Sequence, residues 1–376
     1  MKILHVFNVP FVIPYMLGDQ ITYMNSKGYE IHVACSNGEK IEQYIKKWNF
    51  IFFSLNITRS ISPINDIISI FKLYKYIKQN NIDIVIGHTP KGGLISMIAS
   101  FISSIDKRIY FRHGLLSDTS IGINKIIFDL VEKLTSYFST TTICVSNSIY
   151  NKSISSRLTT KRKLKILNKG TCNGIDVFNE FNNDLVNVND KIQLLSHYNL
   201  DNTNIIVGFI GRLSKDKGIN ELINAWKIVK NNNFKIKLIL CGPIDERDPI
   251  SNELLNYIIN DDSIIYCGEI ESTKLYYSIF SFFILPSYRE GFPTVVLEAS
   301  SMKNAVITTR CTGCIDSIIE NQTGIFTDIN EKAIADSIQF YIDNPNIANL
   351  HGENGRKFVT NNFQQKKIWE EIINIF

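Results

Sequence analysis

The sequence lacks a long hydrophobic segment and a tract of basic residues, two features that would each indicate a broad class of protein. Its longest apolar stretch of interest, residues 94–105, contains four serines and is well short of the ~20 residues that a helix needs to span a bilayer. Lysine and arginine number 40 against 36 aspartates and glutamates, which leaves a formal charge of +4. This excess is too small for bulk nucleic-acid binding. The composition therefore argues against both membrane-spanning and nucleic-acid-binding proteins.

The seven cysteines are scattered and form one C-x-x-C, at Cys311 and Cys314. No second pair and no neighbouring histidine completes a zinc site, so we assign these thiols no role. The chain opens directly on an apolar segment, residues 3–7, without a charged leader or a small-residue cleavage site. We therefore expect a cytoplasmic protein with reduced thiols.

Short segments rich in β-branched residues alternate with longer segments of helical period, which is typical of parallel sheets with crossover helices. The alternation is interrupted at residues 176–204, which are rich in Asn and Asp, and we expect the interdomain connection there. The sequence therefore predicts an α/β fold of two facing doubly wound Rossmann-like domains, residues 1–180 and 181–376, with a last helix that can cross back to the first domain. The expected strands are residues 3–9, 31–35, 83–86, 108–112, 141–145 and 164–167 in the first domain, and 205–210, 235–241, 264–267, 282–285 and 305–309 in the second.

The most informative segment is residues 282–299, because ligands of such sheets bind at the carboxyl ends of strands. A buried strand leads into a short loop and then into a helix that we expect to begin at Pro293, where a missing N–H costs nothing. The amides of Thr294 and Val295 would then point out of the helix N-terminus with the positive end of its dipole. This arrangement predicts a phosphate site.

Two carboxylates accompany this helix. Glu290 lies in the preceding loop, and Glu298 lies on the second turn with a side chain that leans back toward the N-terminus. Carboxylates beside a phosphate site can accept hydrogen bonds from the vicinal hydroxyls of a sugar. Taken alone, a Glu pair at this spacing is common by chance, and the simpler interpretation is a loop residue and a solvated helix residue.

A second loop combines glycines with basic residues. Gly208, Gly211 and Gly218 surround Arg212 and Lys217, after the first strand of the second domain. The glycines let the backbone approach a ligand, and the guanidinium fork and the ammonium suit a diphosphate. The alternative is a strand-to-helix turn with a solvated basic face.

These two segments resemble glycosyltransferase family 4, which has the GT-B fold. The resemblance rests on G-R-L-x(4)-K-G from Gly211 and E-G-F-P-T-x(3)-E from Glu290, in the order found in the family. It implies that Glu290 contacts the donor sugar and Glu298 the ribose of a nucleotide sugar, while Arg212 and Lys217 bind its diphosphate. The other candidate donor-binding residues are Gly211, Gly291, Phe292, Pro293, Thr294 and Val295.

The first domain resembles the family less sharply. The family has a His-Gly after a strand, which implies that His113 lies beside the donor sugar and the acceptor and is catalytic together with Glu290. A histidine in such a place is often only a satisfied polar residue. Two further candidates for the acceptor site are His88, which follows another expected strand, and Gly18, in a loop where the family often has paired glycines. The His88 segment is equally compatible with a simple turn.

The predicted chemistry is sugar transfer without a metal ion or another cofactor. A departing nucleotide leaves negative charge on its diphosphate, which Arg212, Lys217 and the helix amides would stabilise. The sequence has no Asp-x-Asp, the usual metal-binding motif of nucleotide-sugar enzymes. The resemblance implies retention of configuration, and we expect a UDP-linked donor. Two carboxylates could also indicate a glycoside hydrolase, but hydrolysis would require neither Arg212 nor Lys217.

The subset of the family that the chain resembles most builds capsule or O-antigen units. This implies transfer of a sugar, such as an N-acetylated hexose or a deoxyhexose, to a glycan on undecaprenyl diphosphate. Lys72, Lys75 and Lys78 share a helix face with apolar neighbours, which suits peripheral contact with the inner face of the plasma membrane and also an ordinary surface helix. Two alternatives are a nucleotide-sugar epimerase of the same fold and a two-lobed sugar-binding protein, which is disfavoured because no leader precedes the first strand.

Overall fold

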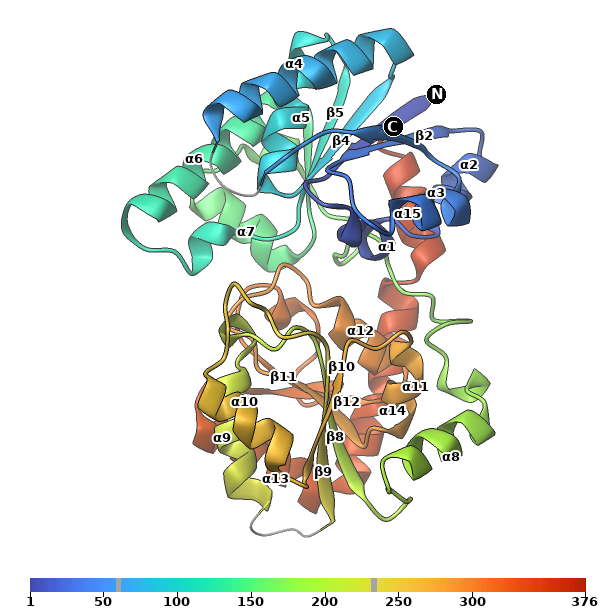
Figure 1. Cartoon of the computed structure of the whole chain (residues 1–376), viewed down its shortest axis with the longest axis vertical. Coiled ribbons are helices and arrows are strands. Elements are labelled where there is room, and N and C mark those ends of the chain that lie inside the picture. Colours follow the sequence, from blue (N-terminus) through green and yellow to red (C-terminus); the bar gives the residue numbers. More distant parts are fainter. Residues whose placement is uncertain (59–61, 231–234) are drawn as a thin grey trace. The chain divides into compact units, whose positions relative to one another are not determined.

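The computed structural model describes residues 1–58, 62–230 and 235–376 and divides the chain into two compact units (Figure 1). The first unit comprises residues 1–174 and 366–376, and the second comprises residues 175–365. Each unit is a parallel sheet with helices packed against it, as the alternation of short and long segments predicts. None of the helices in the described ranges combines the length and the apolar character needed for a transmembrane span.

The first unit contains a parallel sheet whose described strands lie in the order β3-β2-β1-β4-β5-β6-β7. Its central strands consist almost entirely of buried side chains, as expected for a parallel sheet that is covered on both faces. All the strands expected in this domain are present, and β3, at the edge of the sheet, is an additional one. The strands are β1 (Lys2–Val6), β2 (Glu30–Cys35), β3 (Ile51–Ser54), β4 (Ile84–His88), β5 (Lys107–Arg112), β6 (Thr141–Cys144) and β7 (Leu164–Lys165).

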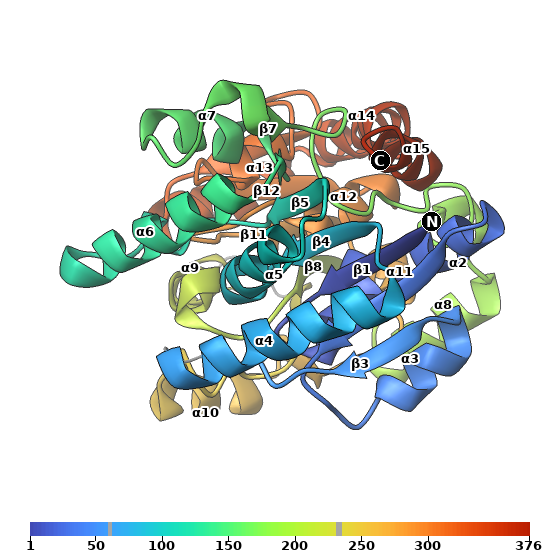
Figure 2. The same cartoon turned by 90° about the horizontal axis from the view of Figure 1, so that it is seen from above.

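The helices of the first unit include a row in which α4 and α6 pack against α5 (Figure 2). The last helix, α15, packs against α2, where the rings of Tyr23 and Trp369 have centroids 5.2 Å apart. Trp369 Nε1 also donates to Asn173 Oδ1 at 2.8 Å, so the C-terminal segment belongs to this unit. The helices are α1 (Ile13–Met16), α2 (Gln20–Ser26), α3 (Ile41–Trp48), α4 (Pro63–Asn80), α5 (Pro90–Ile102), α6 (Gly122–Phe138), α7 (Asn147–Ser155) and α15 (Gln365–Ile373).

The second unit contains a parallel sheet in the order β10-β9-β8-β11-β12-β13 among the described strands, with helices on both of its faces (Figure 1). The strands are β8 (Ile205–Ile210), β9 (Ile236–Cys241), β10 (Ile264–Gly268), β11 (Phe282–Leu285), β12 (Ala305–Thr309) and β13 (Gly324–Thr327). The helices are α8 (Val188–His197), α9 (Ile219–Lys230), α10 (Asn252–Asn260), α11 (Thr273–Ile279), α12 (Thr294–Ser301), α13 (Glu331–Asp343) and α14 (Pro345–Asn362). The described strand β13 lies at a sheet edge and was not expected from the sequence.

The chain passes from the first unit to the second between Gly174 and Ile175, earlier than the expected boundary at residue 180, and returns to the first unit between Gln365 and Lys366. Ile175 and Val177 are buried in the core of the second unit. The backbone amide of Ile175 donates to the carbonyl of Phe363 at 2.8 Å. Apolar packing and this hydrogen bond therefore attach the segment to the second unit.

The Asn- and Asp-rich segment at residues 176–204 is not a simple connection, contrary to our expectation. It contains α8, whose first turn is capped by the Asn187 side chain, which accepts from the amide of Asn189. Leu195 and Leu200 are buried in the core of the second unit. The Asn and Asp side chains form caps and turns with the backbone, which hides the helical period in the sequence.

Candidate functional site

The two motif-bearing loops of the second unit contact each other at the carboxyl ends of β8 and β11. Gly218 has φ of +70°, and a Cβ atom at this position would lie 2.1 Å from the carbonyl oxygen of Pro286. Only glycine combines this conformation with so close an approach. The backbone amide of Tyr288 also donates to the carbonyl of Asp216 at 2.9 Å. The glycine therefore brings the basic loop against the loop that leads into α12.

Lys217 and Glu290, predicted to contact the diphosphate and the donor sugar, form an ion pair with each other through Lys217 Nζ and Glu290 Oε1. Ser287 Oγ donates to the same carboxylate oxygen at 3.0 Å. The side chains of Lys217 and Glu290 are only 15% and 13% exposed. The structure therefore places one residue from each motif in direct contact, and both side chains are largely buried.

Arg212 is held by two carboxylates that the sequence analysis did not single out. Its Nη1 pairs with Asp245 Oδ2, and its Nη2 lies 3.5 Å from Asp216 Oδ2. Arg289 Nη2 lies 3.7 Å from the same oxygen of Asp216. Asp245 comes shortly after the Gly-Pro turn at the end of β9. This position after a strand end was the only feature of the sequence that could have indicated a place in the site. The Arg212 side chain remains 39% exposed.

The helix of the predicted phosphate site, α12, begins at Thr294, one residue later than expected. Pro293 is its N-cap, and the amide of Val296 donates to the Pro293 carbonyl at 3.0 Å. Since the first amides of a helix have no partner within it, Thr294 and Val295 contribute their N–H groups to the helix N-terminus, as predicted. The dipole at this end attracts anions.

Two neighbouring residues of the same motif have structural contacts. Phe292 packs against Phe363, with ring centroids 5.4 Å apart. The carbonyl oxygen of Gly291 would lie 2.5 Å from a Cβ atom at Gly313, which has φ of +85°. The loop that follows β12 therefore packs closely against the motif loop and fixes its course before α12.

Glu298 contacts Tyr277, whose Oη donates at 3.0 Å to Glu298 Oε2 and also lies 3.1 Å from the carbonyl oxygen of Val295. Burial raises the pKa of Glu298 to about 7, although the hydrogen bond from Tyr277 acts in the opposite direction. Tyr277 anchors the carboxylate on α12, and sequence reasoning missed this partner because it lies on α11. Burial therefore favours the neutral form of the Glu298 carboxyl.

In the first unit, His113 lies at the end of β5 and contacts His88 at the end of β4. His88 Nδ1 is 2.9 Å from His113 Nε2, and His88 Nε2 is 3.1 Å from His5 Nδ1. His88 is only 1% exposed. Because both of its ring nitrogens already have histidine partners, this geometry is at odds with the expected direct contact between His88 and an acceptor.

Gly18 closes the loop between α1 and α2. It has φ of +48°, and a Cβ atom there would lie 2.7 Å from the carbonyl oxygen of Pro14. This single glycine therefore permits a tight turn in the loop for which an acceptor role was expected, a role that stays a prediction. A neighbouring loop is fixed by Asn8, whose Oδ1 accepts from Thr89 Oγ1 at 2.6 Å and from the amide of Gly92 at 2.8 Å.

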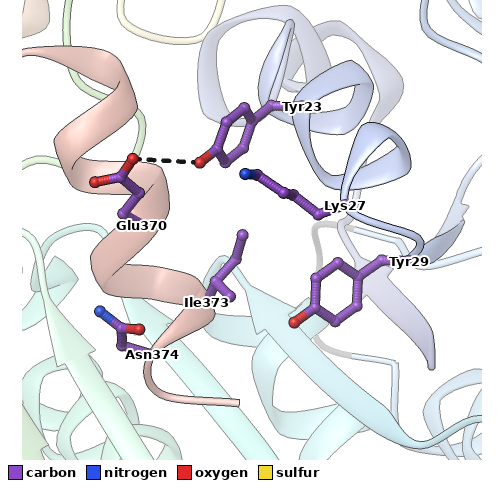
Figure 3. A pocket seen from close by; sticks show the side chains of 6 residues that line it. All are labelled: Tyr23, Lys27, Tyr29, Glu370, Ile373 and Asn374. Carbon is purple, nitrogen blue, oxygen red and sulfur yellow. Dashed lines mark hydrogen bonds between the residues drawn. The ribbon is translucent and has the colours of Figure 1, made fainter.

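A pocket of about 320 Å³ lies where α15 packs on α2 (Figure 3). Residues 27–29 immediately precede β2, so this pocket lies at the amino ends of the strands, away from the loops with the predicted site residues. Among the residues that the structure describes, no group of three or more His, Cys, Asp or Glu is placed to hold a metal ion. The pocket is lined by Tyr23, Lys27, Tyr29, Glu370, Ile373 and Asn374.

Comparison with known proteins gives matches along the whole chain. Residues 3–147 match the family model "Glycosyl transferase 4-like", and residues 190–358 match "Glycosyl transferases group 1". The chain is 33% identical to the capsular polysaccharide biosynthesis glycosyltransferase CapM of Staphylococcus aureus over 376 residues, which cover 100% of this chain and 96% of that protein.

Two further known proteins match this chain over its full length. The chain is 21% identical to the UDP-Gal:alpha-D-GlcNAc-diphosphoundecaprenol alpha-1,3-galactosyltransferase of Escherichia coli, with 100% of this chain and 96% of that protein covered. The crystal structure of Anabaena HepE in complex with UDP and glucose superposes with a TM-score of 0.84 at 18% identity, over 100% of this chain and 98% of that one. This likeness shows that the chain has a known two-domain α/β fold.

Proposed function

Since this chain belongs to glycosyltransferase family 4 and has the GT-B fold, we propose that it transfers a sugar from a nucleotide diphosphate to a lipid-linked glycan. The transfer retains the configuration of the sugar and serves capsule or O-antigen synthesis. The observation that carries this proposal is the contact between the two motif loops, where Lys217 pairs with Glu290 beside the N-terminus of α12. Positive charge for a diphosphate and a carboxylate for a sugar hydroxyl are thereby concentrated at one end of the sheet.

The basic residues act on the leaving group. Arg212 and Lys217 are each held by a carboxylate, of Asp245 and Glu290 respectively, so their charges are already positioned and need little reorganisation when a diphosphate binds. Phosphate oxygens would replace the carboxylates as partners of the two cations. Preorganised charges of this kind stabilise the negative charge that develops on the departing diphosphate. We infer that these two side chains and the α12 amides suffice without a metal ion.

The two carboxylates of the second motif act on the rest of the donor. Once Lys217 turns to a phosphate, Glu290 is released to accept a hydrogen bond from a sugar hydroxyl. Glu298, held by Tyr277, accepts hydrogen bonds from the ribose hydroxyls in its ionised form. Carboxylates bind hydroxyls at charge-assisted strength, so both contacts orient the donor in addition to the phosphate contacts.

The names of two relatives support a UDP-linked donor and a lipid-linked acceptor in the synthesis of a surface polysaccharide. The E. coli relative is named for UDP-Gal and for an acceptor on diphosphoundecaprenol, and the S. aureus relative is named for capsular polysaccharide. We propose a UDP-linked donor, with an N-acetylated hexose or a deoxyhexose as its sugar, and an undecaprenyl-diphosphate glycan as the acceptor. The reaction then takes place at the cytoplasmic face of the inner membrane.

The surface of the first unit supports contact with that membrane. The face of α6 exposes apolar side chains at intervals of three and four residues, which places them along one side of the helix. On α4, Lys72, Lys75 and Lys78 are exposed together with four large apolar side chains. The exposed apolar residues are Ile64, Ile67, Ile68 and Phe71 on α4, and Ile123, Ile126, Leu130, Leu134 and Tyr137 on α6.

Apolar side chains beside lysines suit an anionic bilayer surface. Co-sedimentation with anionic vesicles at low salt tests this contact. Replacing Lys72, Lys75 and Lys78 together by Gln should weaken binding on the order of a hundredfold, given ~1 kcal/mol for each basic residue near the surface. Ile259→Ser, at an exposed apolar position of the second unit, is the control. Absence of salt-sensitive binding by the unaltered protein would refute the contact.

A thermal-shift screen against nucleotide sugars tests the donor, because a ligand that binds only the folded state raises the Tm. The sugar that gives the largest shift is then supplied in labelled form with an undecaprenyl-diphosphate glycan, and we expect label in the lipid fraction. An epimerase of the same fold would convert the labelled nucleotide sugar without any acceptor. Conversion without an acceptor, and no label in lipid, would replace the proposed function by that alternative.

A further inference from the structure

Three histidines form a continuous row inside the first unit. His5 Nδ1 lies 3.1 Å from His88 Nε2, and His88 Nδ1 lies 2.9 Å from His113 Nε2. The strands that carry or precede them, β1, β4 and β5, are neighbours in the sheet. His5 and His88 are each 1% exposed. The row therefore leads from the interior of the sheet to His113, the histidine for which the sequence predicts a catalytic role.

Aromatic neighbours fix the central ring. The ring of His88 stacks on Phe7 at a centroid distance of 4.2 Å and an interplanar angle of 14°. It also stacks on Phe111 at 5.2 Å and 8°. Because rings in dense packing on two sides have little freedom to rotate, His88 keeps one nitrogen toward His5 and the other toward His113.

All three rings are neutral near pH 7. Burial lowers the pKa of His5 to about 3 and the pKa of His113 to about 4. Burial, and secondarily the neighbouring His113 and His5, hold the pKa of His88 well below its usual value. A neutral imidazole has one N–H donor and one lone-pair acceptor. A row of neutral rings therefore allows two consistent arrangements, with the proton on every Nδ1 or on every Nε2.

The inner end of the row distinguishes these arrangements. His5 Nε2 is buried and has no hydrogen-bond partner among the residues that the structure describes. With protons on Nε2, a buried N–H would be left without an acceptor at this point. With protons on Nδ1, only a lone pair is left there. Since orphaned buried N–H groups are rarer in proteins than under-satisfied acceptors, the Nδ1–H arrangement is favoured.

We propose that His5 and His88 are positioning residues that hold His113 in its neutral Nδ1–H form. Nε2 of His113 then accepts from His88, and Nδ1–H is the group left for a ligand. His113 thus donates a hydrogen bond to a sugar or acceptor oxygen and does not remove a proton. The identity of that ligand rests on the proposed function.

The proton of the acceptor hydroxyl must therefore go elsewhere. As the bond from the acceptor oxygen to the anomeric carbon forms, the bond from that carbon to the phosphate oxygen breaks. The phosphate oxygen that leaves takes the proton, so that the nucleoside diphosphate carries it away. The bonds formed and broken and the proton are thereby accounted for, without an oxidant, a metal ion or an additional base.

The tautomer can be measured without an assay of activity. The full-length protein, labelled with 15N at its six histidines, is studied by imidazole NMR at pH 7, with single His variants for assignment. We expect His113 to be neutral and protonated on Nδ1. A proton on Nε2 of His113, or a charged ring, would overturn the proposal. Since the measurement needs no substrate, its outcome is separate from that of the proposed function.

Kinetics of three variants test the positioning role. His88→Leu removes both hydrogen bonds, whereas the amide of His88→Asn can reach the position of Nδ1 and donate to His113. We expect kcat to fall about 10- to 100-fold in His88→Leu, as is usual when the partner that orients a functional histidine is lost, and to be largely restored in His88→Asn. The affinity for UDP should stay unchanged in both variants.

His32→Leu is the matched control, because His32 is also 1% exposed in the same unit but bonds Tyr76 and Glu30 outside the row. It should leave kcat near that of the unaltered protein. Equal losses of kcat in His88→Leu and His88→Asn, or no loss in His88→Leu, would contradict a positioning role. If the variants do not fold, the NMR measurement on the unaltered protein still tests whether His113 is neutral and protonated on Nδ1.

Discussion

The two units place opposite kinds of side chain at the carboxyl ends of their strands. In the second unit, Arg212, Lys217 and Glu290 are charged and paired. In the first unit, the corresponding position is occupied by a row of three histidines, of which His5 and His88 are buried, and the pKa values of all three are lowered by desolvation. Under the proposed function, the charged side chains of the second unit bind the diphosphate and the hydroxyls of the donor, whereas the neutral histidine row of the first unit orients a single hydrogen-bond donor.

The charged cluster also differs from the histidine row in how it is held. Lys217 binds Glu290 and Arg212 binds Asp245, so each cation has a protein anion that a phosphate group must displace. The histidine row is fixed by burial and ring stacking and has no partner to exchange. We therefore expect substitutions in the second unit to alter binding and electrostatics, and substitutions in the first to alter orientation.

The largest effect is expected for Glu290→Ala. If Glu290 contacts the donor sugar as proposed, its loss should lower transfer by about a thousandfold, comparable to removal of an electrostatic group from a transition state. UDP binding should be largely retained because Lys217 remains. Glu320→Ala, which breaks the exposed pair with Arg310, is the control. Loss of UDP affinity comparable to the loss of transfer would show that Glu290 has a different role.

A smaller effect is expected for the cations. Lys217→Met or Arg212→Met should weaken UDP binding about 10- to 100-fold, because a hydrogen bond to a charged group contributes ~1.5–3 kcal/mol. Calorimetry with UDP measures the change, and Arg310→Met serves as the control on an exposed arginine of the same unit. If both variants bind UDP as the unaltered protein does, the phosphate site lies elsewhere and the contrast between the units fails.

The smallest effect is expected from the protonation of Glu298. Because burial raises the pKa of Glu298 to about 7, its carboxyl is protonated below that pH and ionised above it. Under the proposed function, only the ionised form would accept hydrogen bonds from both ribose hydroxyls, so UDP affinity should rise with pH through about 7, by up to about tenfold for one charged hydrogen bond. In Glu298→Gln this rise should disappear. An unchanged pH profile in that variant would mean that another group titrates.

The sequence predicted the second unit better than the first. The bounds of β8, β11 and β12 agree with the expected strands because each is a continuous apolar segment that is buried in the sheet. The described edge strands β3 and β13 were missed, since neither is buried throughout and their apolar signal is therefore weaker than that of β11, which has the same length. Local motifs also identified Lys217 and Glu290, whose contact the structure shows.

Partners that come from distant strands could not be predicted in this way. His5 and His88 are 83 positions apart, and their contact follows from the order of β1 and β4 in the sheet. Asp245 likewise reaches Arg212 from the strand beside β8. Spacing within a motif shows which residues share a loop, whereas these contacts depend on which strands are neighbours.

The most direct test of the account is a calorimetric titration with UDP in the presence of EDTA. We expect the unaltered protein to bind UDP with an affinity within about twofold of that measured with Mg²⁺, since two cationic side chains and a helix N-terminus supply the positive charge. The double variant Arg212→Met/Lys217→Met should show no measurable binding. Binding that is lost in EDTA and restored by Mg²⁺ or Mn²⁺ would contradict the account.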